Sequence, residues 1–84
     1  MTLNDYRIEK GLTFEQLAKN LGFKGKNPAT LAVRICLSGN PRYWKLPNAE
    51  MMIKIQDDIT KGQVKIEEMV RSFLRKKKEY EQSK

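Results

Sequence analysis

Apolar residues along this 84-residue chain recur at spacings of three and four, the period of an amphipathic helix, and no segment alternates as a strand does. Five such helical segments are expected. Each of the first four is followed by a glycine, which favours the left-handed backbone of a helix C-cap. These glycines are Gly11, Gly22, Gly39 and Gly62. The pattern predicts an all-α fold.

Each of the first four helices also begins after a residue whose side chain accepts hydrogen bonds from the free amides of a first turn. These expected N-caps are Thr2, Thr13, Asn27 and Asn48. Gln16 completes a capping box with Thr13, and Pro28 suits a first helical position because it has no N–H to leave unpaired. The third helix is expected to end near Ser38.

The fourth helix repeats Met52, Ile55 and Ile59 at helical spacing. Helical geometry turns one member of the neighbouring pair Met51 and Met52 outward, where it is available for a dimer contact.

The last helix begins with two glutamates, which favour the helix dipole, and continues as an apolar face. That face consists of Ile66, Met69, Val70 and Phe73. It ends near Arg75, so residues 1–74 are expected to form one domain and residues 75–84 a basic, frayed, solvated tail.

Positive charge is concentrated in the middle of the chain. Residues 16–49 contain no acidic side chain, and their six basic residues supply most of the formal net charge of +7. A basic face neutralises phosphates and releases counterions, so double-stranded DNA is the expected partner. The alternative is a solvated basic face without a partner.

The inventory of side chains excludes several other classes. The chain has no histidine and a single cysteine, Cys36, which rules out an internal disulfide, histidine-based catalysis and a Cys/His zinc site. No enzymatic activity, metal or cofactor is expected, and Cys36 is expected to be a small buried hydrophobe. The chain shows neither a long apolar run nor a signal-peptide pattern, so a cytoplasmic location is expected.

Residues 12–23 meet the demands of a helix-turn-helix, which needs a small residue where two helices cross and a glycine in the turn. Ala18 and Gly22 supply them, between flanking apolar residues. Here the sequence resembles the Cro and phage-repressor (Xre-type) family of helix-turn-helix regulators. The segments that carry this resemblance are Leu12-Thr13-Phe14-Glu15-Gln16-Leu17-Ala18, Leu21-Gly22-Phe23, Ser38-Gly39-Asn40-Pro41-Arg42, Pro47-Asn48-Ala49-Glu50-Met51-Met52 and residues 59–69.

The resemblance implies a compact five-helix, lambda-repressor-like domain. Its third helix, about residues 28–38, would enter the major groove of DNA, and the protein would act as a small transcriptional regulator, a repressor. Because one such domain reads few bases, a homodimer on paired half-sites is expected, with the last helix as the dimer contact.

Two departures from the family pattern affect the interface. Phe14 stands where many members carry a phosphate-binding glutamine, so this contact passes to Gln16 or Lys19. The turn is also longer. An insertion of four residues over 24–27 turns Ala32 and Ile35 inward, with Leu31 in support, and turns Thr30, Val33, Arg34 and Leu37 toward the groove. An insertion of five would instead bury Val33 and Cys36 and expose Ile35; the first register is preferred.

In that register Arg34 is the candidate for base recognition, because a guanidinium bonds guanine O6 and N7 together, with a phosphate contact as the alternative. Thr30 would contact a thymine methyl group or a phosphate. Lysines before the third helix and a basic cluster after it would contact the backbone, whereas Trp44 is expected in the core. The full set of candidate DNA-binding residues is Gln16, Lys19, Lys24, Lys26, Asn27, Thr30, Val33, Arg34, Arg42, Tyr43 and Lys45.

A second hypothesis is a protein-interaction module, such as an antitoxin or an accessory factor, in which the same fold is a scaffold. Positive charge on the exposed face of the third helix favours DNA over this alternative.

Overall fold

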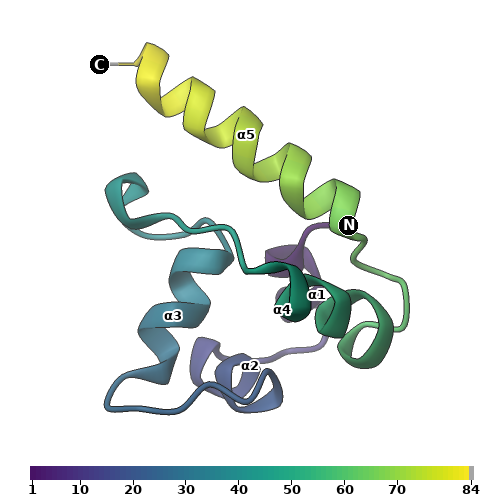
Figure 1. The fold of residues 1–84 in the computed structure, drawn as a ribbon. Coiled ribbons are helices and arrows are strands. Elements are labelled where there is room, and N and C mark those ends of the chain that lie inside the picture. The colour runs from purple at the N-terminus through teal and green to yellow at the C-terminus, as the bar shows by residue number, and fades with distance from the viewer. Residues whose placement is uncertain (84) are drawn as a thin grey trace.

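The chain is all-helical: the computed structural model describes residues 1–83, and within them it contains helices and no strand (Figure 1). This confirms the predicted fold class. The elements in chain order are α1 (Leu3–Glu9), α2 (Phe14–Asn20), α3 (Pro28–Ile35), the 3-10 turn η1 (Pro41–Tyr43), α4 (Ala49–Lys54), the π-helical turn η2 (Ile55–Ile59) and α5 (Ile66–Gln82).

Side-chain caps begin α1, α2 and α4 as predicted. Thr2 and Thr13 form capping boxes, and the Asn48 side chain accepts a hydrogen bond from the Met51 amide. Asn27 is the N-cap residue of α3, as predicted, but the predicted side-chain cap bond is absent. Its backbone angles, φ −136° and ψ 71°, differ from those of the other caps, and its side chain makes no cap bond. The side-chain amide of Asn27 therefore lies at the start of α3 without a hydrogen bond to the first turn of the helix.

The end of α3 also differs from the prediction. The helix ends at Ile35, three residues before Ser38, and Leu37 adopts the left-handed conformation with φ 57°. The Leu37 amide bonds the Arg34 carbonyl at 3.2 Å, and the Ser38 amide bonds the Val33 carbonyl at 3.1 Å, which is the Schellman pattern. A leucine in this conformation is strained by roughly 1–2 kcal/mol, so the preference for glycine did not locate this helix end.

The core lies where α2 crosses α3. Ala18 and Ala32 are both fully buried, and their small side chains permit a close crossing. Ile35 is only 9% exposed, as the register with four inserted residues predicts, and Cys36 is 5% exposed, as the alternative predicts, so the end of α3 buries both side chains. Cys36 is buried as well, as its expected role as a small hydrophobe requires.

The segment between α4 and α5 is held by a buried threonine. The Thr60 hydroxyl donates to the Ile55 carbonyl at 2.8 Å and accepts a bond from the Val64 amide at 3.1 Å. Ile55 and Val64 are fully buried. Thr60 therefore fixes the widened turn η2 and the bridge to α5, neither of which follows from a helical periodicity of apolar residues.

Helix α5 lies across the other helices and is longer than its apolar face predicts. It runs without interruption to Gln82, through the segment that we expected to be frayed. The Trp44 ring lies 6.4 Å from the Tyr80 ring, and the Lys76 ammonium group lies 5.6 Å from the Trp44 ring centroid. These contacts with the loop after α3 extend the helix beyond Arg75. Among the described residues no helix has the length and apolar character needed to cross a membrane.

Candidate nucleic-acid interface

Helix α3 lies at one edge of the molecule, packed on α2 through its inner face (Figure 1). Thr30 is the exposed side chain of α3, and Pro28, Ala29 and Arg34 are half-buried. The helix is about 12 Å long at 1.5 Å per residue. Two groups of candidate residues lie at its two ends.

At the first end, the turn before α3 carries exposed lysines. Lys24 and Lys26 flank Gly25, whose φ of 119° is open to glycine but strained for other residues. Among the described residues neither lysine forms an ion pair, and the Asn27 side chain makes no hydrogen bond within the chain. This end of α3 therefore presents positive charge and an unused amide to solvent.

Helix α2 adds a weaker contribution to the same end. The side-chain oxygen Oε1 of Gln16 accepts a hydrogen bond from the Thr13 backbone amide at 2.8 Å, so only the amino group of this side chain is available for an external contact. Lys19 lies 3.8 Å from Glu15, in an exposed ion pair that reduces its net charge. Both candidates are exposed, but each has an internal role.

At the second end, two guanidinium groups surround one tyrosine. The Cζ atoms of Arg34 and Arg42 lie 5.3 Å and 5.8 Å from the Tyr43 ring centroid. Cation–π contacts of this length orient an arginine side chain without using its hydrogen-bond donors. The tyrosine is 51% exposed, so the cluster faces solvent.

The loop that carries this cluster is tied to α3 by hydrogen bonds. The Lys45 amide bonds the Arg34 carbonyl at 3.2 Å, and the Trp44 indole N–H donates to the Ser38 carbonyl at 3.0 Å. The Asn40 side chain accepts a bond from the Arg42 amide and so begins η1. The structure thus brings Arg34, Arg42, Tyr43 and Lys45 together.

Two residues differ from their expected orientation. Val33 is half-buried beneath the loop, since its Cγ1 would lie 3.2 Å from a Cβ at position 39. Leu37 is also half-buried and lines an interior hollow with Leu3 and Pro47. Neither side chain is free for the groove, because the tight turn after Ile35 folds the chain back over them.

The aromatic and methionine side chains outside the cluster mostly serve packing. Trp44 is half-buried against Tyr80 of α5 and lies outside the core, in which we expected it. Met51 and Met52 both pack against the core, so the prediction that one of them faces outward is wrong. The outward position on α4 belongs to Ile53, which is 50% exposed.

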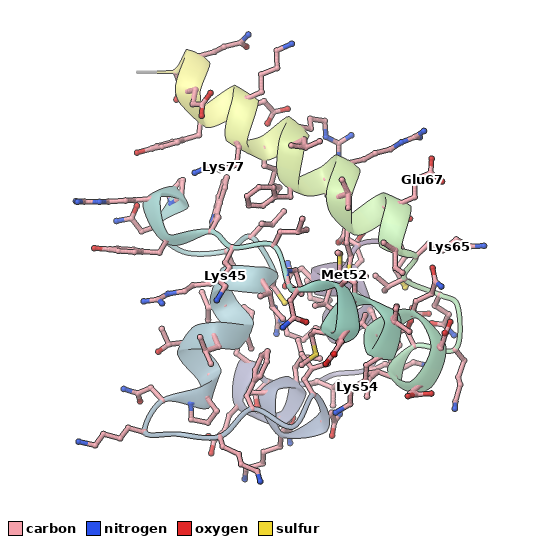
Figure 2. The ribbon with its side chains drawn as sticks, in the orientation of Figure 1. Lys45, Met52, Lys54, Lys65, Glu67 and Lys77 are labelled. Atoms are coloured by element: carbon pink, nitrogen blue, oxygen red, sulfur yellow. The ribbon has the colours of Figure 1, made fainter. Side chains whose placement is uncertain are left out.

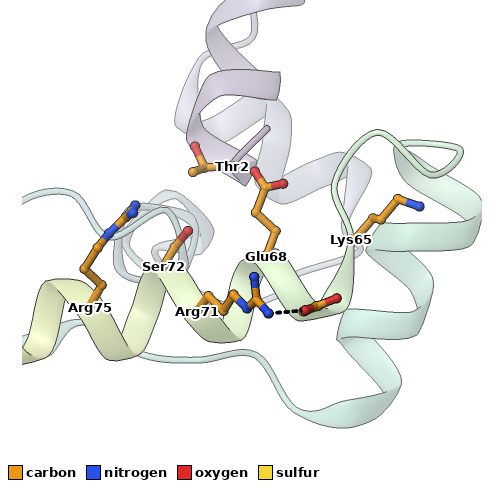
Figure 3. Close-up of a pocket in the computed structure, with 7 residues that line it drawn as sticks. Thr2, Lys65, Glu68, Arg71, Ser72 and Arg75 are labelled. Carbon is orange, nitrogen blue, oxygen red and sulfur yellow. Dashed lines mark ion pairs between the residues drawn. The ribbon is translucent and has the colours of Figure 1, made fainter.

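A hollow lies between the start of α1 and α5 (Figure 3). It has a volume of about 370 Å³ and is lined by side chains of both signs. Arg71 pairs with Glu67 at 2.6 Å, and Glu68 pairs with the ammonium group of Met1. This internal neutralisation leaves little net charge for binding an ion.

The acidic and sulfur side chains bear on two further kinds of site, a metal site and a reactive thiol. The described residues contain no cluster of acidic or sulfur side chains that would hold a metal ion. Burial raises the pKa of the Cys36 thiol to about 12, against a smaller opposing effect of Arg7. The thiol is thus protonated at neutral pH and is a poor nucleophile.

Comparison with known protein families, curated proteins and solved structures finds no match to this chain. The family resemblance of residues 12–23 therefore stays a prediction, and the case for function depends on the geometry and charge of the surface around α3.

Proposed function

We propose that this protein binds double-stranded DNA by placing α3 in the major groove and acts as a small transcriptional repressor. The observation that carries the proposal is the set of cations at the two ends of α3, Lys24 and Lys26 at the start and Arg34 and Arg42 on Tyr43 at the end, with no carboxylate in residues 16–49. A helix of this width fits the major groove of B-DNA.

The two ends of α3 would have different tasks. Arg34 keeps its donors free while Tyr43 holds its plane, which suits bidentate bonding to a guanine. Lys24 and Lys26 are flexible point charges at the other end and would neutralise phosphates. Thr30 and Asn27 lie between these positions, where they would contact a base edge or the backbone.

Dimerisation on paired half-sites completes the proposal, because one α3 reads only a few base pairs. The exposed Leu74 of α5, 61% accessible, fits a dimer contact through the last helix. Sedimentation of the full chain, alone and with a duplex, would show a dimer, and Leu74→Gln would weaken it. A monomer in both conditions contradicts the dimer but leaves the groove contact in place.

The test of DNA binding itself needs no knowledge of the operator, because the electrostatic part of the affinity is independent of sequence. We expect the full chain to bind a mixed-sequence duplex of about 20 base pairs at low salt, with an affinity that falls steeply between about 50 and 200 mM salt. No binding at the lowest salt concentration would overturn the proposed function.

A protein-interaction role is the second candidate, and one observation favours it. An apolar groove of about 200 Å³ lies between α3 and α4, lined by Phe23, Leu31, Leu46 and Met51 among others. Grooves of this kind accept apolar side chains of a partner. A chain that fails to bind duplex DNA but loses a protein partner on Leu31→Asp would support this candidate.

A further inference from the structure

The middle of α5 carries a run of positive charge that ends before Glu79 and Glu81. Residues 69–78 contain five cations and no carboxylate. The apolar face of the helix ends near Phe73, yet the helix continues to Gln82. The charged turns therefore have a structure of their own that burial of apolar surface does not explain.

Contacts with the loop after α3 hold these turns in place. The Lys76 ammonium group lies 5.6 Å from the Trp44 ring centroid and 3.5 Å from the Leu37 carbonyl oxygen. Lys77, four residues after Phe73, is half-buried at a position of the inner face. Figure 2 shows Lys77 on the side of α5 toward the loop that carries Lys45.

This arrangement joins two basic segments that are distant in sequence. Trp44, which contacts Lys76, directly follows Tyr43, which contacts Arg34 and Arg42. Of the five cations in residues 69–78 only Arg71 forms an ion pair among the described residues, with Glu67, and neither Glu79 nor Glu81 takes part in one. The loop after α3 thus has cations of α3, of the loop itself and of α5 on its aromatic side chains, and none of these cations is in an ion pair among the described residues. A polyanion would be attracted to such a surface.

We propose that the last turns of α5 are a second phosphate-contacting element, which binds the DNA backbone beside the groove that α3 enters. The inference rests on the proposed function and extends its interface to Lys76 and Lys77. The aromatic rings of Trp44 and Tyr80 act as a support that fixes the lysines relative to the loop.

The chemistry favours DNA over an anionic lipid surface. A helix that lies on a membrane needs a wide exposed apolar face opposite its charges. The only large apolar side chain of α5 that is strongly exposed among the described residues is Leu74. A duplex needs only the cations, and these adjoin the arginine cluster already placed beside α3.

The test compares two variants that lose the same charge. Lys76→Gln with Lys77→Gln removes the proposed contacts, and Lys61→Gln with Lys65→Gln removes two exposed cations from elsewhere. Each phosphate contact contributes about 0.9 to the slope of log affinity against log salt. On a mixed-sequence duplex we expect the first variant to flatten the slope by about one to two, and the control by less than about half a unit.

Restoring the charge sharpens the result. Lys76→Arg with Lys77→Arg should recover the slope of the natural chain, because arginine also neutralises phosphate. If the glutamine pair lowers the melting temperature, Lys77→Gln with Lys78→Gln tests the same turns while keeping the Lys76 contact with Trp44.

Several outcomes overturn the inference. An equal change in both glutamine variants would show an effect of net charge alone. An unchanged slope with intact duplex binding would remove α5 from the interface and leave the proposed function standing. If Lys76→Gln with Lys77→Gln weakened binding to vesicles of anionic lipid but not to the duplex, α5 would likewise be removed from the DNA interface and the proposed function would stand. Failure of the natural chain to bind a duplex would instead overturn the proposed function itself.

Discussion

The two ends of α3 present positive charge in different ways. At the start, Lys24 and Lys26 are exposed, and among the described residues they contact no carboxylate and no aromatic ring. At the other end, Arg34 is held over Tyr43 by a loop that is itself hydrogen-bonded to α3. The comparison suggests two different roles in binding. The fixed arginine recognises a base, and the free lysines add affinity for any sequence.

The largest expected effect concerns the anchor of the fixed end. Ile35→Ala should lower the free energy of unfolding by about 2–5 kcal/mol, because it removes a buried side chain from the contact between α2 and α3. Urea denaturation followed by circular dichroism measures this change. Thr30→Ala, on the exposed side of the same helix, should change the free energy of unfolding by less than about 0.5 kcal/mol. Equal effects of the two substitutions would contradict the register.

Next in size is the loss of base recognition. Arg34→Ala should leave the melting temperature nearly unchanged and cost about 1–3 kcal/mol of binding at one position of a selected site. Selection from a random duplex pool, followed by titration of single-base variants, measures the position. Arg42→Ala is the matched control, since it contacts the same ring and should weaken all sequences alike. Uniform weakening by Arg34→Ala would make it a phosphate contact.

The free end should show a smaller effect without sequence preference. Lys24→Ala combined with Lys26→Ala should flatten the salt slope by about one to two units and weaken every duplex to the same extent. Titrations at several salt concentrations, with the natural chain as reference, provide the measurement. If the affinity fell for one duplex sequence only, this turn would recognise bases, and the proposed difference in role between the two ends of α3 would be contradicted.

The smallest expected effect is on the reactivity of the Cys36 thiol, which follows the last residue of α3 and reports whether the fixed end is closed. Because burial raises its pKa to about 12, the native thiol should react slowly with a disulfide reagent at pH 8 and rapidly in urea. The same shift makes folding stability fall as pH rises above 9.0, the ordinary value of this thiol, since the unfolded chain then releases a proton that the folded chain keeps. Trp44→Ala should accelerate native labelling by loosening the loop, and fast labelling of the natural chain would show that this end is open.

Local patterns predicted the caps and the inward faces of the helices better than the turns between them. The capping boxes at Thr2 and Thr13 depend on side chains within one turn, and the inward faces of Ala32 and Ile35 follow from helical spacing. The strained turn at Leu37 is different, because the packing of a leucine outweighs its backbone preference. Sequence spacing contains no information about that balance.

The candidate site, too, was only partly predictable from the sequence. Charge and spacing identified Arg34, Arg42 and Tyr43, but only the folded loop brings them into one cluster. The role of Lys76 was not predicted, because the apolar face of α5 ends before it. Its one signal in the sequence is the absence of carboxylates in residues 69–78, and the contact with Trp44 depends on the fold.

The most direct test of the central claim is a map of the backbone amides that respond to DNA. The full chain, labelled with 15N, is titrated with a mixed-sequence duplex while amide chemical shifts are recorded. We expect the largest changes between Lys24 and Arg34 and in the loop from Arg42 to Lys45. If the largest changes lay instead around the hollow at Glu67 and Arg71, with α3 unaffected, the claim that α3 is the DNA-binding element would be contradicted.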